Sequence, residues 1–266
     1  MEPIGIKNPF PGASAFLIER TESTQEEAKR LAAKGYPPGS LVAADAQSAG
    51  RGRFPERHWE SEAGKNLLFT IYLDAATAAL SGLPLRIGLA LCAAVSDYAS
   101  LLGARFPSPP RIKWPNDLLV GDRKAAGILC EAGPAGVFAG IGLNCNQRSF
   151  PRELSATVTS LANELGREVR RWALLELFLE LLQSALADPL WREEVDKRLW
   201  RRGEELSFLP GTAGREKCLE GDAIIGILEG IDESGSILIR QKNEEKVRSY
   251  PAGELTLISP LYKVVI

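Results

Sequence analysis

The sequence predicts an α/β fold, in which helices and strands build one larger domain and short β-strands build a smaller one. Apolar runs of strand length alternate with helical segments as far as about residue 204. Beyond that point the chain changes to short β-like runs separated by turns such as Asp-Glu-Ser-Gly and Pro-Ala-Gly, which is typical of a small barrel of about five strands. We therefore expect two domains, 1–204 and 205–266, with the boundary between Arg202 and Leu206.

A strand over 14–20 is the first expected element, and a helix follows it at once. Ser23 or Thr24 can cap this helix, Glu26 completes a Ser-x-x-Glu capping box with Ser23, and Gly35 can end the helix. The next expected elements are strands over 40–45 and 66–73 and a helix over 84–102, with Gly103 just past its end.

A hairpin is the next feature that the sequence predicts. A short strand over 111–114 is stopped by Pro115, because proline donates no hydrogen bond to a neighbouring strand. Strands over 117–120 and 125–132 flank the turn Gly-Asp-Arg-Lys. A buried strand over 136–144 and helices over 160–166, 172–186 and 191–200 complete the larger domain.

Composition and charge exclude several classes of function. The net charge of −2 creates no overall field that would favour nucleic acids or membranes. None of the four cysteines forms a Cys-x-x-Cys pair, so we expect reduced, mostly buried thiols. The single histidine, His58, argues against a histidine metal site or a Ser-His-Asp triad. There is no signal peptide, and the longest apolar segment is interrupted by Arg86 and Asp97, so a cytoplasmic protein without membrane contact is expected.

The stretch "AQSAGRGRFPERHW", residues 46–59, is the first candidate site. Arg51 and Arg53 alternate with glycines, which let a backbone approach a ligand closely, and arginine forks match the oxygens of phosphates and carboxylates. Two other interpretations remain: a solvated basic turn, and an Arg-Gly element that contacts RNA. Acidic residues nearby, such as Glu60 and Glu62, weaken the RNA interpretation.

Polar residues at strand ends form a second group of candidates. Asn116 and Asp117 either make an ordinary turn or project into a cleft, where Asp117 suits a ribose hydroxyl or Mg²⁺. Lys124 is either a solvated hairpin lysine or a point charge for a carboxylate or an α-phosphate. Because residues 125–127 (Ala-Ala-Gly) lack bulk, a ligand could lie flat against that strand.

Two further motifs allow two interpretations each. Asn144 offers a donor and an acceptor that suit a purine edge, but asparagine at a strand end is also a common turn former. Ser23 and Thr24 are candidate helix caps, and the same helix N-terminus is a suitable binding site for an acceptor group.

Taken in order, the segments "EST", "AQSAGRGR", "HWES", "GKNL", "KWPNDLLVGDRKAAGILCE" and "GIGLNCNQ" resemble the biotin–protein ligases, which charge biotin-dependent carboxylases. The likeness covers about Phe16 to Asn146, and a weaker one continues through "LWRRGEELSF". It implies a mixed β-sheet flanked by helices in a catalytic domain that binds biotin and ATP, followed by a small SH3-like β-barrel. It also implies two steps: biotin attacks Mg–ATP to give biotinyl-5′-AMP and pyrophosphate, and a lysine of a biotin carboxyl carrier protein attacks this adenylate.

The resemblance implies roles for individual residues. Those that match the positions holding the ureido ring are Ser23, Thr24, Gln25 and Gln47. Those that match the loop closing over biotin and phosphate are Arg51, Gly52 and Arg53, and Lys124 matches the lysine that touches the biotin carboxylate and the α-phosphate. Positions near the nucleotide are matched by Asn116, Asp117 and Asn144, with Asp117 as the candidate ligand of Mg²⁺. ATP and Mg²⁺ are the implied cofactors, and a monomer or homodimer is expected.

The sequence departs from the family pattern at two places. Phe54, Pro55 and Glu56 stand where the family commonly has a further glycine, so Pro55 should stiffen the loop, and no role follows for Arg57 or His58. Some relatives carry an N-terminal winged-helix domain that binds DNA. Here the first strand begins near Ser14, so we expect no such domain and no DNA binding.

Two alternative functions remain. One is a lipoate– or octanoyl–protein ligase, against which the Gly-Arg-Gly-Arg and Lys-Trp-Pro-Asn-Asp motifs favour biotin. The other is a biotin-binding module without turnover, against which the retained Arg51, Arg53 and Lys124 argue.

Overall fold

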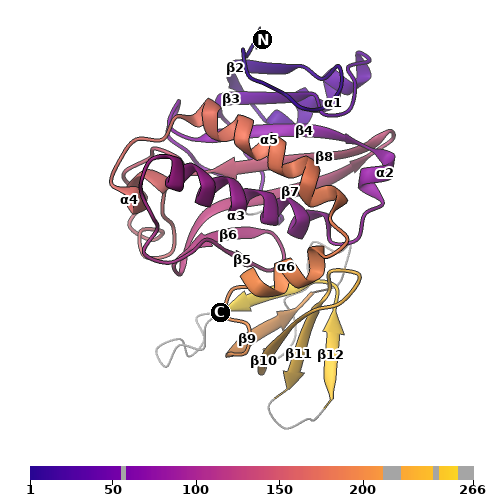
Figure 1. Ribbon diagram of the computed structural model, residues 1–266, viewed down its shortest axis with the longest axis vertical. Coiled ribbons are helices and arrows are strands. Elements are labelled where there is room, and N and C mark those ends of the chain that lie inside the picture. The colour runs from indigo at the N-terminus through magenta and orange to yellow at the C-terminus, as the bar shows by residue number, and fades with distance from the viewer. Residues whose placement is uncertain (55–57, 212–222, 242–245, 257–266) are drawn as a thin grey trace.

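A computed structural model describes residues 1–54, 58–211, 223–241 and 246–256 and arranges them around two β-sheets (Figure 1). The larger sheet has eight strands in the order β1-β2-β3-β4-β8-β7-β6-β5. Their bounds are β1 (Glu2–Pro3), β2 (Ala15–Thr21), β3 (Leu41–Gln47), β4 (Leu67–Asp74), β5 (Arg111–Lys113), β6 (Asp117–Val120), β7 (Arg123–Gly133) and β8 (Gly136–Leu143). Strands β2 and β3 are parallel and the other pairs are antiparallel, so the sheet is mixed, as expected.

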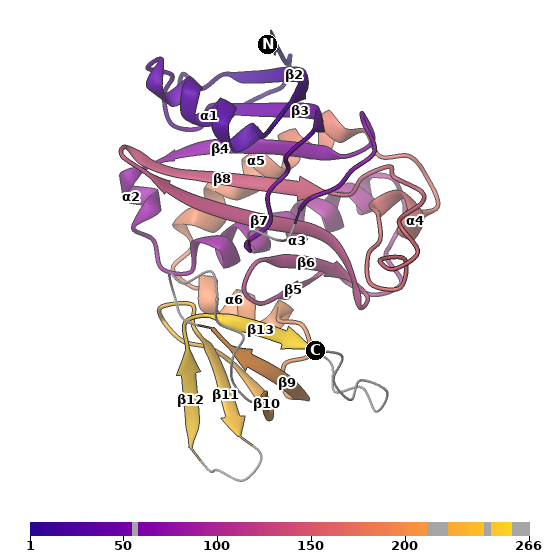
Figure 2. The same cartoon turned by 180° about the vertical axis from the view of Figure 1, so that it is seen from behind.

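Helices lie on both faces of the larger sheet. Helices α3 (Leu83–Leu101) and α5 (Arg171–Ala187) cover one face, and α1 (Thr24–Ala33) lies on the other (Figures 1 and 2). The remaining helices are α2 (Ala75–Ala78), α4 (Leu161–Leu165) and α6 (Trp191–Arg198). The face of α1 is less covered than the face of α3 and α5, which leaves part of β7 and β8 open (Figure 2).

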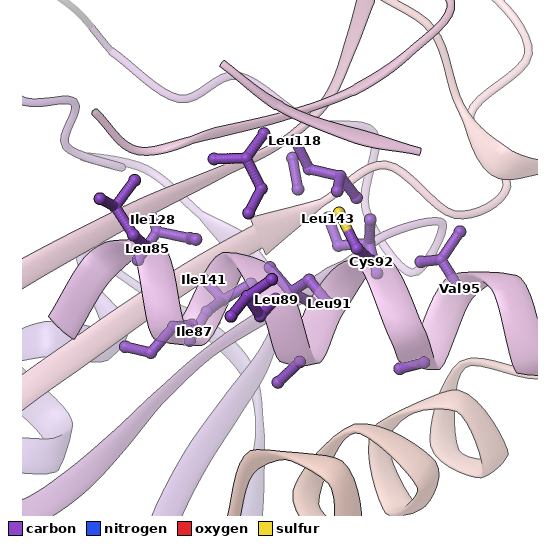
Figure 3. Packing of buried hydrophobic residues seen from close by; sticks show 14 of the residues in the cluster. Leu85, Ile87, Leu89, Leu91, Cys92, Val95, Leu118, Ile128, Ile141 and Leu143 are labelled. Carbon is purple, nitrogen blue, oxygen red and sulfur yellow. The ribbon is translucent and has the colours of Figure 1, made fainter. Parts of the chain in front are cut away.

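Helix α3 forms the centre of the core because apolar residues occur on almost every side of it. Leu85, Leu89 and Cys92 pack with β-strand residues such as Ile128 and Ile141 (Figure 3). Burying each such side chain contributes about 1.5–3 kcal/mol. Arg86, which argued against a membrane span, is buried and donates to the carbonyl oxygens of Ala185, Leu186 and Asp188 at the C-terminal end of α5.

The second sheet has five antiparallel strands in the order β12-β11-β10-β9-β13. Their bounds are β9 (Glu205–Pro210), β10 (Ile224–Ile231), β11 (Ile237–Gln241), β12 (Val247–Tyr250) and β13 (Gly253–Thr256). Trp114, next to β5, joins the two sheets: its indole Nε1 donates to the carbonyl oxygen of Gly235 at 2.9 Å, and its ring meets Phe208 edge-on.

The expected order of elements in the larger domain is confirmed, with ends that differ by a few residues at most. Ser23 caps α1 by accepting from the backbone of Gln25, and Gly35 follows its end with a φ of +84°. The second half of the predicted capping box is wrong, because the Glu26 carboxylate accepts from Lys29 and Arg51 instead.

The cysteines that the structure describes are free, as expected. Burial raises the pKa of Cys92, Cys130 and Cys145 to about 12, so these thiols stay protonated at neutral pH. Cys218 lies outside the described residues. Within the described part of the chain, no helix is both long and apolar enough to cross a membrane.

Candidate active site

A cleft of about 790 Å³ opens on the less covered face of the larger sheet, a volume within the usual range for small-molecule sites. All the residues predicted for the site line it: Ser23, Thr24, Gln25, Gln47, Arg51, Gly52, Arg53, Asn116, Asp117, Lys124 and Asn144. They come from segments more than a hundred residues apart in sequence, and the fold gathers them along one hollow.

At one end, helix α1 and strand β3 place hydroxyl and amide groups against each other. The Oε1 atom of Gln47 accepts from the backbone N–H of Thr24 at 2.7 Å and from its hydroxyl at 3.0 Å. Thr24 is 3% exposed, and Thr70 of β4 donates to its hydroxyl at 2.9 Å. We call Thr24, Gln25 and Gln47, with the buried Thr70 behind them, the amide end of the cleft.

Gln25 leaves one buried atom without a partner. Its Nε2 donates to the carbonyl oxygen of Leu129 at 2.9 Å and, more weakly, to that of Phe138 at 3.4 Å. Its Oε1 has no hydrogen-bond partner among the described residues, although the residue is only 4% exposed. Because an unpaired buried acceptor is costly, this oxygen is suited to an N–H of a bound ligand.

Lys124 reaches the cleft because of a β-bulge. Leu118 pairs with Ala126 but Leu119 pairs with Lys124, so Ala125 is an extra residue in β7. In a regular strand Lys124 and Gly127 would face opposite sides of the sheet, since they are three positions apart, which is an odd number. With the bulge, the Lys124 side chain lies beside Gly127 in the cleft.

Lys124 forms an ion pair with Asp117 in this structure, with 2.7 Å between Nζ and Oδ1. The backbone of Lys124 is also held, because its N–H donates to Thr157 and its carbonyl oxygen accepts from Thr159. The backbone that carries the Lys124 ammonium is therefore fixed, and an anionic ligand would have to share the ammonium with Asp117 or displace Asp117 from it.

The two asparagines of the cleft use their amide donors within the protein. Asn116 Nδ2 donates to the carbonyl oxygen of Ile128 at 2.7 Å, and Asn144 Nδ2 donates to that of Thr159 at 3.0 Å. One of the two N–H groups of the Asn144 amide is thus used within the protein, and the other N–H and Oδ1 are the atoms left for the predicted contact with a purine edge.

Each arginine of the Gly-Arg-Gly-Arg stretch contacts a different part of the protein. Arg51 Nη2 lies 2.6 Å from Oε1 of Glu26 on α1, and its Nη1 lies 3.6 Å from Oε1 of Glu131 on β7. Hydrogen bonds from Lys29 and then from Arg51 hold the pKa of Glu26 below its usual value. Arg53 Nη2 donates to the carbonyl oxygen of Gly253 in the second sheet at 2.8 Å. We call Arg51, Arg53, Asp117 and Lys124 the cationic end.

The segment after β3 crosses in front of β8 and β7 (Figure 2) and pairs with itself at its base. Arg51 and His58 form an antiparallel bridge, and the Trp59 N–H donates to the carbonyl oxygen of Gly50. The Trp59 indole lies against Gly142 so closely that a Cβ there would come within 2.5 Å of the ring. Its Nε1 is buried and lacks a partner among the described residues.

Sequence reasoning missed three kinds of site residue. Trp59 was part of the motif but received no role, and the glycines Gly140 and Gly142 were seen only as part of a buried strand. Alternating glycines on one face of that strand are the signal that would have indicated a close approach from above. Thr70 stands alone in the apolar run "NLLFTIYL", which is the signal for a buried hydroxyl with a partner.

One prediction about the cleft floor is wrong in part. Ala125 and Ala126 are fully buried in the core, because the bulge turns both away from the cleft, and only Gly127 of the three small residues lines it. The departure at Phe54–Arg57 is described only for Phe54, since 55–57 lie outside the described residues.

Known proteins with similar sequences have one activity in common. The profile of the biotin/lipoate A/B protein ligase family matches residues 17–147. The chain is 34% identical over 260 residues to a biotin–[acetyl-CoA-carboxylase] ligase of Paracoccus denitrificans, a match that covers 90% of this chain and 98% of the relative. It is 32% identical over 256 residues to the bifunctional ligase/repressor BirA of Bacillus subtilis, covering 93% of this chain and 75% of the relative.

The fold is also similar to that of a solved enzyme. A biotin protein ligase from Aquifex aeolicus in complex with biotin and ATP aligns with a TM-score of 0.75 and 28% identity, over 91% of this chain and 97% of that chain.

Proposed function

This chain belongs to the biotin–protein ligases, within the biotin/lipoate A/B protein ligase family, and we propose that the cleft holds biotin at its amide end and the reacting phosphate at its cationic end. The chain is a ligase that activates biotin with ATP and transfers it to a lysine of a carboxyl carrier protein. One observation carries the assignment of ends: Lys124 and Arg51 lie in the same cleft as the paired hydroxyls and amides of Thr24 and Gln47.

The first step forms a mixed anhydride. A carboxylate oxygen of biotin attacks the α-phosphorus of ATP, a new P–O bond forms, and the bond to the β-phosphate breaks to release pyrophosphate. Negative charge grows on the α-phosphate oxygens during this step, and fixed cations stabilise charge where it develops. Lys124 is the best-placed cation, because the bulge and two backbone hydrogen bonds hold it in the cleft.

The amide end suits the polar edge of biotin. A ureido group has one carbonyl oxygen between two N–H groups, so it needs both a donor and an acceptor from the protein. Gln47 has Nε2 as a donor, and Gln25 has Oε1 as a buried acceptor that no described residue binds. Ser23 and Thr24 are held at the same helix N-terminus.

The nucleotide is proposed to lie beyond Lys124, near Asn116, Asp117 and Asn144. The indole of Trp59 offers a flat face for a purine, since bases stack on aromatic side chains with little regard to sequence. Asn144 can contribute its Oδ1, which accepts from an exocyclic amine, and the second N–H of its amide. Asp117 can take a ribose hydroxyl if Lys124 turns toward the phosphate.

Mg²⁺ is proposed to arrive as part of the substrate Mg–ATP. No three His, Cys, Asp or Glu side chains of the described chain lie close enough to form a metal site. Asp117 is the predicted ligand, but its carboxylate is engaged by Lys124. A protein-held magnesium cage does not fit these residues, whereas Mg²⁺ held mainly by phosphates and water does.

In the second step the neutral amine of a carrier lysine attacks the carbonyl carbon of the adenylate, the C–O bond to AMP breaks, and an amide forms with loss of the amine proton. Water must be kept away until the carrier arrives, because it would hydrolyse the anhydride. The Gly-Arg-Gly-Arg stretch is proposed as the cover, since Arg51 and Arg53 fasten it to α1 and to the second sheet.

We further propose that residues 1–204 form the catalytic domain and that residues 205–266 form an SH3-like barrel. The support is an antiparallel sheet of five strands that begins at Glu205. Trp114 donates to the carbonyl oxygen of Gly235, in the turn between β10 and β11, and Arg53 donates to that of Gly253 in β13, so this region contributes to the frame of the cleft.

ATP–pyrophosphate exchange tests the function directly. Biotin, octanoate and lipoate are compared as acyl substrates at equal concentration. We expect exchange with biotin and at least a hundredfold less with the other two, because neither fatty acid has a ureido edge to pair with Gln25 and Gln47. Exchange driven best by lipoate or octanoate would indicate the alternative ligase, and no exchange with any substrate would indicate a binding module without turnover.

A further inference from the structure

We infer that Thr70 is a positioning residue that helps to hold the Gln47 amide with its Nε2 toward the cleft. This inference rests on the proposed function, because the amide end is taken as the site of the ureido group. Thr70 lies in the middle of β4, is 0% exposed and does not line the cleft. It acts, in this interpretation, through Thr24.

The direction of each hydrogen bond in the chain Thr70–Thr24–Gln47 follows from the atoms involved. The Oε1 atom of an amide can only accept, so the Thr24 hydroxyl must donate its proton to Gln47. The Thr24 oxygen is then left as an acceptor, and the Thr70 hydroxyl donates to it at 2.9 Å. The protons of both hydroxyls are therefore committed, and both point toward Gln47.

This arrangement fixes the orientation of the Gln47 side chain. The two ends of an amide have almost the same shape, so a glutamine turns over unless its neighbours distinguish oxygen from nitrogen. Here Oε1 receives two donors from Thr24, its N–H and its hydroxyl. No described residue accepts from Nε2, and Gln47 lines the cleft, so its two N–H groups are available to a ligand.

Gln25 is fixed in the opposite sense. Its Nε2 is bound by the carbonyl oxygen of Leu129, so Oε1 is the free atom. The amide end thus offers one donor from Gln47 and one acceptor from Gln25. A ureido edge presents a carbonyl oxygen beside an N–H, which is the complementary pair, and a reversed Gln47 would set two oxygens against each other.

Removing the Thr70 hydroxyl should weaken the preference for this orientation of the Gln47 amide, although Thr70 itself does not contact the ligand. The buried Thr24 oxygen would lose its only hydroxyl donor, and the Thr24 proton could then turn away from Gln47. Valine has nearly the shape of threonine and no hydroxyl, whereas serine keeps the hydroxyl. Comparison of the valine and serine variants therefore separates the effect of the lost hydrogen bond from the effect of altered packing.

The experiment measures ATP–pyrophosphate exchange by the full-length wild-type chain and by Thr70→Val and Thr70→Ser. Biotin and desthiobiotin, which share the ureido group but differ in the second ring, are the substrates. We expect Thr70→Val to raise KM about tenfold for both, while kcat and the KM for ATP stay within about twofold. Thr70→Ser should return the KM for biotin to within about threefold of wild type.

A matched control is available in Ser40, another fully buried hydroxyl, which accepts from the backbone N–H of Ser14 and does not line the cleft. Ser40→Ala should leave the KM for biotin unchanged. If Thr70→Val folds poorly by circular dichroism, Thr70→Ala replaces it in the comparison with Thr70→Ser.

Three outcomes would overturn the inference. They are an unchanged KM for biotin in the variant without the hydroxyl, an equal rise in the KM for ATP, and a serine variant no better than valine. A wild-type chain without biotin-dependent exchange would instead overturn the proposed function, and the inference with it.

Discussion

The two ends of the cleft are built in opposite ways. At the amide end, buried side chains bind each other and leave single atoms free, the Gln25 Oε1 and the Gln47 Nε2. At the cationic end, each charged group already has a protein partner: Arg51 has Glu26, Arg53 has the carbonyl oxygen of Gly253, and Lys124 has Asp117. One end is ready for its ligand, and the other must exchange partners.

The difference follows from the chemistry of the two ligand groups. A neutral ureido edge binds through a few directed hydrogen bonds, so the protein gains by fixing donors and acceptors in advance. A phosphate binds through charge, and cations left alone in a cleft would repel each other and any incoming cation. Protein acceptors hold them until a stronger anion arrives. The predictions below disturb one end or the other, from the largest expected effect to the smallest.

The largest effect is expected from Lys124→Ala, which removes the fixed cation of the cationic end. Adenylate formation should fall by about 100-fold or more, because charge on the α-phosphate loses its nearest stabilising group. Single-turnover formation of biotinyl-AMP measures this. The double variant Lys124→Ala/Asp117→Ala controls for the carboxylate left unpaired, and near-normal turnover in either would remove Lys124 from the mechanism.

Gly142→Ala should disturb both ends at once. The new Cβ would come within 2.5 Å of the Trp59 ring, so the base of the Gly-Arg-Gly-Arg stretch must move. Overpacking of this kind costs about 1–3 kcal/mol of unfolding free energy, and we expect a fall in kcat/KM of about thirtyfold. Denaturant unfolding measures the change in unfolding free energy, and the kinetics of ATP–pyrophosphate exchange measure the change in kcat/KM.

The double variant Gly142→Ala/Trp59→Ala removes the clash but not the loss of the indole. Its free energy of unfolding should return toward the wild-type value, whereas its kcat/KM should stay low. A stable single variant with normal kinetics would show that Trp59 can move without consequence.

Arg53→Ala should release the cover without preventing the first step. The stretch would lose its hydrogen bond to Gly253, so biotinyl-AMP should escape about tenfold faster while its rate of formation changes little. Rapid filtration of preformed complex measures the escape. Retention equal to wild type would contradict the role of Arg53, and Gly253 itself is no control because its contact is through the backbone.

The smallest effect is expected from Glu26→Gln, which removes the nearer of the two carboxylate partners of Arg51. Exposed ion pairs are weak, so the adenylate should bind only about two- to threefold more tightly. Glu27→Gln is the matched control, since Glu27 is next on the same helix and pairs with Arg30 instead. Weaker binding in Glu26→Gln would mean that Glu26 positions Arg51 for the ligand and does not compete for it.

The pH dependence of this pair has a definite sign. Arg51 and Lys29 lower the pKa of Glu26 in the folded chain. The pair is therefore fully formed above the usual pKa of about 4.3 and is lost as pH falls through the lowered value. The difference between Glu26→Gln and wild type should accordingly disappear in acid.

The sequence predicted the elements of the larger domain and the residues of the cleft better than it predicted their partners. Capping residues, and prolines and glycines that end an element, are local signals, so the ends of α1 and α3 could be predicted from the sequence. The place of Lys124 was predicted, but its reason was not, because the bulge at Ala125 depends on pairing with β6. In a strand without the bulge, the alternation of side chains would have placed Lys124 on the face of the sheet opposite the cleft.

Side-chain contacts between residues that are distant in sequence could not be predicted. Nothing near Arg51 indicates Glu131, and nothing near Thr24 indicates Thr70, since each contact depends on how α1 packs on the sheet. The capping box failed in part for the same reason, because the Glu26 carboxylate accepts from Arg51 of another segment as well as from Lys29 on its own helix.

Trp59 gives the chain an optical reporter of its own. Its indole lies at the base of the covering stretch, with the Lys124 ammonium 5.7 Å from the ring centre and a buried Nε1 that has no hydrogen-bond partner among the described residues. The emission of an indole depends on nearby charge and on hydrogen bonding at that nitrogen. We therefore expect a ligand that draws Lys124 away, or gives Nε1 an acceptor, to shift the emission of Trp59.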